Sequence, residues 1–138
     1  MPDIVQNYEM NAKPDEVWEA LVTPDIIQIW SGDEAKMSEN IGFEWSMWGG
    51  QMFGKNIEVI PNKKLVQDWC YHLWDKDRPT KVTFTIKPKG KGSVVELLHQ
   101  GVPDKSLKSI TEGWDTYYLG AMQEMFEEKA KKEAQKKK

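Results

Sequence analysis

The residues of this sequence that could do chemistry are few, and their spacing matches no known catalytic motif. The chain has two histidines, His72 and His99, and neither has a cysteine or carboxylate at the spacing of a metal site. Cys70 is the one cysteine, and no Gly-x-Ser-x-Gly segment supplies a nucleophilic serine. Segments 48–51 and 89–93 are rich in glycine but fit no phosphate-binding pattern, so they predict turns. We therefore expect no metal, no cofactor and no enzymatic activity.

Aromatic and methionine side chains point more clearly to a function. The chain contains seven tryptophans, four tyrosines, four phenylalanines and seven methionines. Methionine fills irregular space, and Trp or Tyr joins an apolar body to a polar tip, so these residues suit the wall of an adaptable pocket. They equally suit a packed core, and the sequence leaves both interpretations open. The candidate cavity residues are Trp45, Met47, Met52, Trp69, Trp114, Tyr118 and Met122.

Several of these residues surround a glycine pair, at positions 49–50. A two-residue hairpin turn at this pair would place Met47 opposite Met52 and Trp45 opposite Gly54. The indole could then cover the bare glycine, and Trp45, Met47 and Met52 would share the inner face of the sheet.

The same hairpin places other apolar side chains outside. Trp48 and Phe53 fall on the opposite face, and Trp48, at the turn, is the candidate contact for a partner. Further along the second strand, Ile57 and Val59 are out of phase with the preceding apolar positions. We therefore expect a bulge near Gly54.

Length and charge predict a single domain over residues 1–138. The net charge of −3 hides an asymmetry, because residues 129–138 carry six lysines and one glutamate, which leaves −8 on residues 1–128. An acidic body argues against a nucleic-acid surface, and we expect the Lys-rich segment 129–138 to be a frayed helix end. No segment approaches the roughly 18 consecutive apolar residues of a membrane span, and the first residues lack the pattern of a secretory signal. The expected location is the cytoplasm, without a membrane partner.

The order of the expected elements defines the fold class. Residues 4–10 read as a strand, and Pro14 and Pro24 each open a short helix. Short alternating runs over residues 34–100 predict an antiparallel meander. A long helix follows, for which Ser109 and Glu112 have the spacing of a capping box. The apolar stripe of this helix consists of Trp114, Tyr117, Tyr118, Ala121, Met122, Met125 and Phe126.

This order predicts an α+β helix-grip (START-like) fold. In such a fold a curved antiparallel sheet wraps around the long C-terminal helix, and here two short helices follow the first strand. Any space between the sheet and the helix would be an apolar cavity.

Several segments resemble one family over nearly the whole chain. They are Thr23–Trp30, Gly54–Trp69, Trp74 with Thr80–Ile86, Gly101–Pro103 and, most specifically, Gly113–Tyr118. These segments resemble the carboxy-terminal domain of the activator of the 90-kDa heat-shock protein ATPase, within the START-like (SRPBCC) superfamily. The resemblance implies the helix-grip fold and a non-enzymatic, chaperone-associated role.

Two function hypotheses follow. The first, implied by the resemblance, is a domain that binds the 90-kDa heat-shock chaperone and stimulates its ATPase. The second is a binder of an apolar small molecule or lipid in the cavity between sheet and terminal helix. An enzymatic alternative, a cyclase or hydrolase, would require convergent polar groups inside that cavity.

Overall fold

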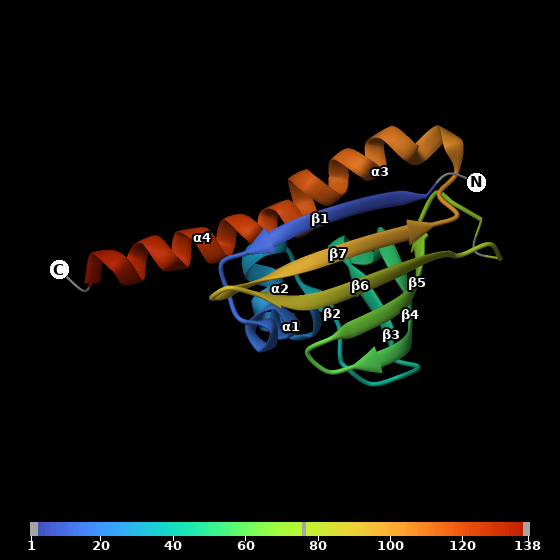
Figure 1. Ribbon diagram of the computed structural model, residues 1–138. Coiled ribbons are helices and arrows are strands. Elements are labelled where there is room, and N and C mark those ends of the chain that lie inside the picture. The colour runs from blue at the N-terminus through green and yellow to red at the C-terminus, as the bar shows by residue number, and fades with distance from the viewer. Residues whose placement is uncertain (1–2, 76, 137–138) are drawn as a thin grey trace.

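The computed structural model describes residues 3–75 and 77–136, and it has the predicted α+β architecture (Figure 1). The chain forms a seven-stranded sheet, two short helices after the first strand, and a helical segment that closes the chain. The elements are β1 (Ile4–Met10), α1 (Pro14–Val22), α2 (Pro24–Ser31), β2 (Ala35–Lys36), β3 (Glu44–Met47), β4 (Met52–Ile60), β5 (Lys64–Tyr71), β6 (Thr80–Lys89), β7 (Gly92–Gln100), α3 (Leu107–Gly113), a π-helical turn (Trp114–Tyr118) and α4 (Leu119–Lys136).

The sheet is antiparallel throughout, in the order β1-β7-β6-β5-β4-β3-β2. Its inner face alternates as expected: Val82, Phe84 and Ile86 of β6 are buried, and the residues between them are half-buried or exposed. Helix α1 packs on β6 and β7, and α2 packs against α4. The sheet therefore curves around the helices, which confirms the helix-grip fold (Figure 1).

Local signals explain the two short helices. Each begins at a proline, Pro14 or Pro24, whose fixed φ suits the first helical turn. Helix α2 ends where Gly32 adopts a left-handed conformation, with φ of 80°, which a residue with a side chain rarely adopts. Both helix starts, and the helix end at residues 31–33, confirm the sequence prediction.

The hairpin around the glycine pair has the predicted register. Met47 pairs with Met52, and Trp45 pairs with Gly54. The connection is longer than the two residues predicted: a 3-10 turn, Trp48–Gly50, lies between the paired residues, and Gly49 (φ 66°) and Gly50 (φ 90°) both have the positive φ that glycine favours.

The expected bulge lies further along β4 than predicted. The register between β4 and β5 is continuous from Phe53 to Asn56 and shifts between Asn56 and Glu58. Asn56 is buried and donates hydrogen bonds to the carbonyls of Ser38 and Asn40, at 2.7 and 3.1 Å. This polar anchor occupies the inward position, so Ile57 turns outwards and is 45% exposed.

Gly54 of β4 lies where the backbone of β5 approaches closely, so a side chain at this position should destabilise the protein. A Cβ atom at this position would lie 1.9 Å from the carbonyl oxygen of Asp68 and 3.1 Å from Nε1 of Trp45. Gly54→Ala is therefore expected to lower the free energy of unfolding by about 2–3 kcal/mol, measured by urea denaturation. Unchanged stability would show that β4 and β5 can separate at this point without cost.

The closing helix starts earlier than the capping-box spacing predicted. Ser109 lies inside α3, which begins at Leu107, and its hydroxyl donates to the carbonyl of Ser106 at 3.2 Å. The single turn Asp104–Ser106 precedes α3 and leaves no room for a cap at Ser109. The proposed capping box is therefore wrong.

A π-helical turn changes the phase of the predicted apolar stripe. Trp114, Tyr118, Met122 and Phe126 are buried, but Tyr117 is 64% exposed. Trp114 and Tyr118 are four residues apart and share one face of the helical segment. The π turn rotates less per residue than an α-helix, and this turns Tyr117 away from that face. The sequence prediction that Tyr117 belongs to the core is wrong for this reason.

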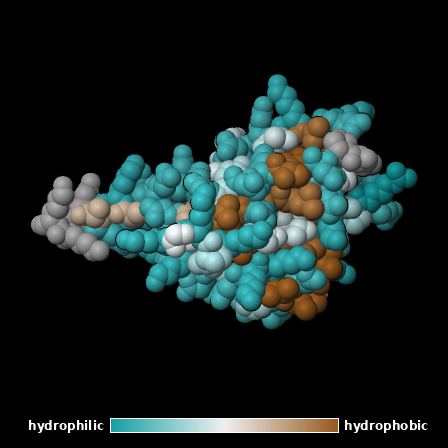
Figure 2. Space-filling view, in the orientation of Figure 1, coloured by the Kyte–Doolittle hydropathy of each residue, from teal (hydrophilic) through white to brown (hydrophobic). Residues whose placement is uncertain are grey.

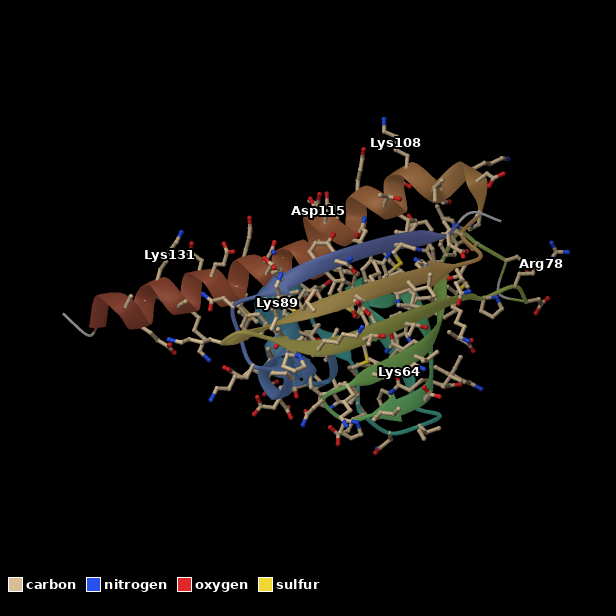
Figure 3. The ribbon with its side chains drawn as sticks, in the orientation of Figure 1. Lys64, Arg78, Lys89, Lys108, Asp115 and Lys131 are labelled. Carbon is tan, nitrogen blue, oxygen red and sulfur yellow. The ribbon has the colours of Figure 1, made fainter. Side chains whose placement is uncertain are left out.

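The helical segment is fixed along β1 by polar contacts. Gln6 Nε2 donates to the carbonyl of Thr111 at 3.2 Å, and Gln123 Nε2 donates to that of Glu9 at 2.9 Å. The Tyr8 hydroxyl lies 3.4 Å from Asp115 Oδ1, and burial together with this negative charge raises the pKa of Tyr8 to about 12. Figure 3 shows Asp115 on the helix above β1.

The end of α4 projects beyond the sheet (Figure 1), and the face of it seen in Figure 2 is mostly hydrophilic, with a short row of weakly apolar residues. Of the Lys-rich segment that we expected to fray, residues 129–136 continue the helix, and Lys131 extends from it (Figure 3). Residues 137 and 138 lie outside the described part of the chain.

Candidate functional site

A pocket of about 410 Å³ lies between the β3–β4 turn, strand β5 and the helical segment α3–π turn. Aromatic residues form most of its wall. The lining residues are Trp48, Gln51, Met52, Trp69, Tyr71, Ser106, Ser109, Ile110, Gly113, Trp114, Tyr117 and Tyr118.

The pocket brings together four of the seven candidate cavity residues: Met52, Trp69, Trp114 and Tyr118. The other three, Trp45, Met47 and Met122, do not line it. They are at most 1% exposed and belong to the packed core.

The helix period and the strand pleat position the lining side chains. Trp114 and Tyr118 are four residues apart in the helical segment, so both lie on the face that borders the pocket. Trp69 and Tyr71 come from β5, where residues two apart share one face. Sequence reasoning missed Tyr71, although its spacing from Trp69 could have indicated it.

Trp48 takes a different position from the one expected at the hairpin turn. Its φ of 52° is unusual for a residue with a side chain. The half-buried indole donates from Nε1 to the carbonyl of Ser31 at 3.2 Å, and its ring lies edge-on to Tyr118 with centroids 6.1 Å apart. It therefore closes one side of the pocket instead of facing away from it.

Tyr118 is the centre of an aromatic cluster behind the pocket wall. Its ring centroid lies 4.6 Å from Trp114, 4.7 Å from Trp30 and 5.7 Å from Phe84. Trp69 lies 4.9 Å from Trp114 and 5.4 Å from Trp45. Most of these pairs are tilted or edge-on, the geometry that aromatic rings prefer, so the wall is closely packed.

His99 lies fully buried beneath this wall and fixes the helix to the sheet. Trp114 Nε1 can only donate, so His99 Nδ1, 3.1 Å away, accepts and is unprotonated. His99 Nε2 therefore carries the proton and donates to Thr80 Oγ1 at 2.7 Å, and that hydroxyl donates to the carbonyl of Trp69 at 2.7 Å. Burial lowers the pKa of His99 to about 3, so the ring is neutral at pH 7.

Two hydrogen-bond donors on lining residues have no partner among the described residues. They are Trp69 Nε1 and Tyr118 Oη, and both side chains are 3% exposed or less. Burial raises the pKa of Tyr118 above its ordinary value, so its phenol keeps the proton. The described lining residues include no Asp, Glu, His, Lys or Arg. The pocket therefore offers apolar surface and buried donors, without a charged group.

A second hollow, a shallow groove of about 760 Å³, lies between α2 and α4. Its floor includes Trp30 and Met125, and Ile29 at its edge is 70% exposed. Its charged residues are Glu16, Glu19, Glu124, Glu128, Lys129 and Lys132, so acidic groups predominate. Sequence reasoning did not identify this groove.

The pocket and the groove share a wall. Trp30 lines the groove, and its ring lies 4.7 Å from that of Tyr118, which lines the pocket.

No described helix is both long and apolar enough to cross a membrane. In residues 3–75 and 77–136 no cluster of histidine, cysteine and carboxylate side chains could hold a metal ion.

Comparison with known proteins identifies similar chains. An activator of 90 kDa heat shock protein ATPase homolog from Dictyostelium discoideum is 25% identical over 119 residues, which are 86% of this chain and 31% of the relative. The human activator homolog 1 is 21% identical over 113 residues, 82% of this chain and 33% of the relative. The chain thus spans about a third of the length of these curated relatives.

The fold is also similar to that of solved structures. The crystal structure of an HSP90 activator from Plasmodium falciparum superposes with a TM-score of 0.82 at 20% identity, covering 89% of this chain and 94% of that chain. The family model of the Activator of Hsp90 ATPase homolog 1-like proteins matches residues 11–127, and the chain belongs to this family.

Proposed function

We propose that this protein is a non-enzymatic partner of the 90-kDa heat-shock chaperone and stimulates its ATPase. The observation that supports this proposal is the family match over residues 11–127, together with the likeness in fold to an HSP90 activator over nearly the full length of both chains. The protein would act by binding one conformation of the chaperone more tightly than the other, because only a difference in affinity can shift an equilibrium.

The groove between α2 and α4 is our candidate for the contact surface. Ile29 presents an exposed apolar side chain there, and the acidic residues around it, such as Glu19 and Glu124, suit a partner surface with basic side chains. Trp48, the contact predicted from the sequence, lines the pocket and not the groove, and its role in partner binding stays a prediction.

The chaperone's ATPase rate, measured with and without this protein, tests the proposal. We expect stimulation by the parent protein and about tenfold weaker binding for Ile29→Lys, because this change removes an apolar contact and places a lysine against basic partner groups. Leu73→Lys is the matched control, since Leu73 is 75% exposed and lines neither the pocket nor the groove. Absence of both binding and stimulation by the parent would contradict the function. Full activity of Ile29→Lys would contradict the assigned surface alone.

A further inference from the structure

The pocket has features that a contact with a chaperone does not require. We propose that it binds a neutral, flat and largely apolar small molecule whose acceptor oxygen receives hydrogen bonds from Trp69 Nε1 and Tyr118 Oη. This proposal does not depend on the chaperone function.

The size and wall of the pocket favour a flat molecule. A volume of about 410 Å³ falls within the range of about 300–1,000 Å³ that is typical of small-molecule sites. Rings surround it on three sides, from the turn, from β5 and from the helix, and flat ligands bury their faces well against aromatic rings. These rings belong to Trp48, Trp69, Tyr71, Trp114, Tyr117 and Tyr118.

The two unpartnered donors define the polar end of the ligand. Buried N–H and O–H groups nearly always have a hydrogen-bond partner, because an unpaired group loses its interaction with water and recovers nothing. Neither Trp69 Nε1 nor Tyr118 Oη has a partner among residues 3–75 and 77–136, and the ring centroids of these two side chains lie 6.2 Å apart. One acceptor oxygen, or two on the same ligand, would restore both bonds.

A ligand reaches these donors only if the wall moves, because both atoms are buried although their side chains line the pocket. Met52 is the flexible element: it is half-buried, lines the pocket beside the β3–β4 turn and has an unbranched side chain. We assign the required movement to this side chain, because the rings around the pocket pack closely against one another.

The charge of the ligand follows from the same residues. No Lys, Arg, Asp, Glu or His lies among the described lining residues, so an ionised ligand would be buried without a counter-ion. A cation would be attracted by the ring faces but would leave both donors unsatisfied. A ketone, amide or similar neutral oxygen meets both requirements.

A matched pair of probes tests the proposal. 9-Fluorenone and fluorene have the same flat ring system and differ in the carbonyl oxygen, and quenching of the tryptophan fluorescence reports their binding. For the parent protein we expect fluorenone to bind at least tenfold more tightly than fluorene, and the indole N–H signal of Trp69 to shift in NMR spectra with fluorenone.

Tyr118→Phe removes one donor and keeps the ring. This variant should fold, because the lost hydroxyl bonds none of the residues that the structure describes. It should bind fluorenone about fivefold more weakly, with unchanged affinity for fluorene. Tyr8→Phe is the matched control, because it removes a tyrosine hydroxyl outside the pocket lining, and it should retain the parent's preference. Equal affinity of the parent for the two probes, no binding of either probe, or an unchanged preference in Tyr118→Phe would overturn the proposal. None of these measurements involves the chaperone, so the outcome of the ligand test is independent of the outcome of the ATPase test.

Discussion

Gly120→Ala is expected to lower the free energy of unfolding by about 3 kcal/mol and to remove the π turn. A Cβ atom at Gly120 would lie 1.6 Å from the carbonyl oxygen of Asp115, so the backbone has to move. The nearest relaxed state is a regular α-helix, in which α4 is rotated relative to Trp114, so that the aromatic packing around Tyr118 changes. We therefore expect loss of stability in urea denaturation together with a changed near-ultraviolet circular dichroism spectrum.

Gly113→Ala provides the control on the same helical segment. A Cβ atom at Gly113 has no atom within 4 Å, and the backbone there is helical, with φ of −63°. Alanine should leave stability unchanged or raise it by about 0.5–1 kcal/mol, because it restricts the unfolded chain. If Gly120→Ala behaved like Gly113→Ala, the π turn would not depend on the missing side chain.

Acid is expected to destabilise the protein through His99. The pKa of His99 is about 3 in the folded state, below the ordinary value of 6.5 in the unfolded chain. Between these values the unfolded state binds the proton and the folded state does not, so stability is fully present above about pH 6.5 and falls as the pH decreases. The expected loss is about 1.4 kcal/mol per pH unit, or about 3 kcal/mol between pH 6.5 and pH 4.

The two histidines allow a matched comparison. His99→Gln keeps a donor for Thr80 and an acceptor for Trp114, so this variant should fold, with a smaller free energy of unfolding at pH 7. Because glutamine does not titrate, the variant should lose the part of the pH dependence that His99 causes. His72 is exposed, and His72→Gln should retain the pH dependence of the parent. A direct check is the NMR titration of the His99 ring, which we expect to stay neutral down to pH 4. Protonation of that ring near pH 6 in the folded protein would contradict the assignment.

Much of the fold could be predicted because its signals are local. Pro14 and Pro24 open their helices, Gly32 ends the second, and alternation marks Val82, Phe84 and Ile86 as the inner face of β6. The register of the β3–β4 hairpin followed from its glycine turn, since the centre of a turn determines which residues lie opposite one another. The seven candidate cavity residues are all buried or half-buried, because large apolar side chains avoid water in either a core or a pocket wall.

The remaining features depend on contacts between distant segments. Asn56 bonds the loop carbonyls of Ser38 and Asn40, and this moves the bulge to Ile57. The indole of Trp48 bonds Ser31, 17 residues away, and so turns towards the pocket. No periodicity in the sequence reports such bonds.

The sequence by itself determined the order of the elements, the faces of the strands and the family resemblance, because each of these rests on neighbouring residues or on a regular period. Only the tertiary structure decided which aromatic residues border empty space, that Tyr117 is exposed at a π turn, and that two buried donors bond none of the described residues. The physical reason is that burial and hydrogen bonding depend on which distant groups the fold brings together. The chemistry of the pocket therefore depends on how the closing helix packs against β5.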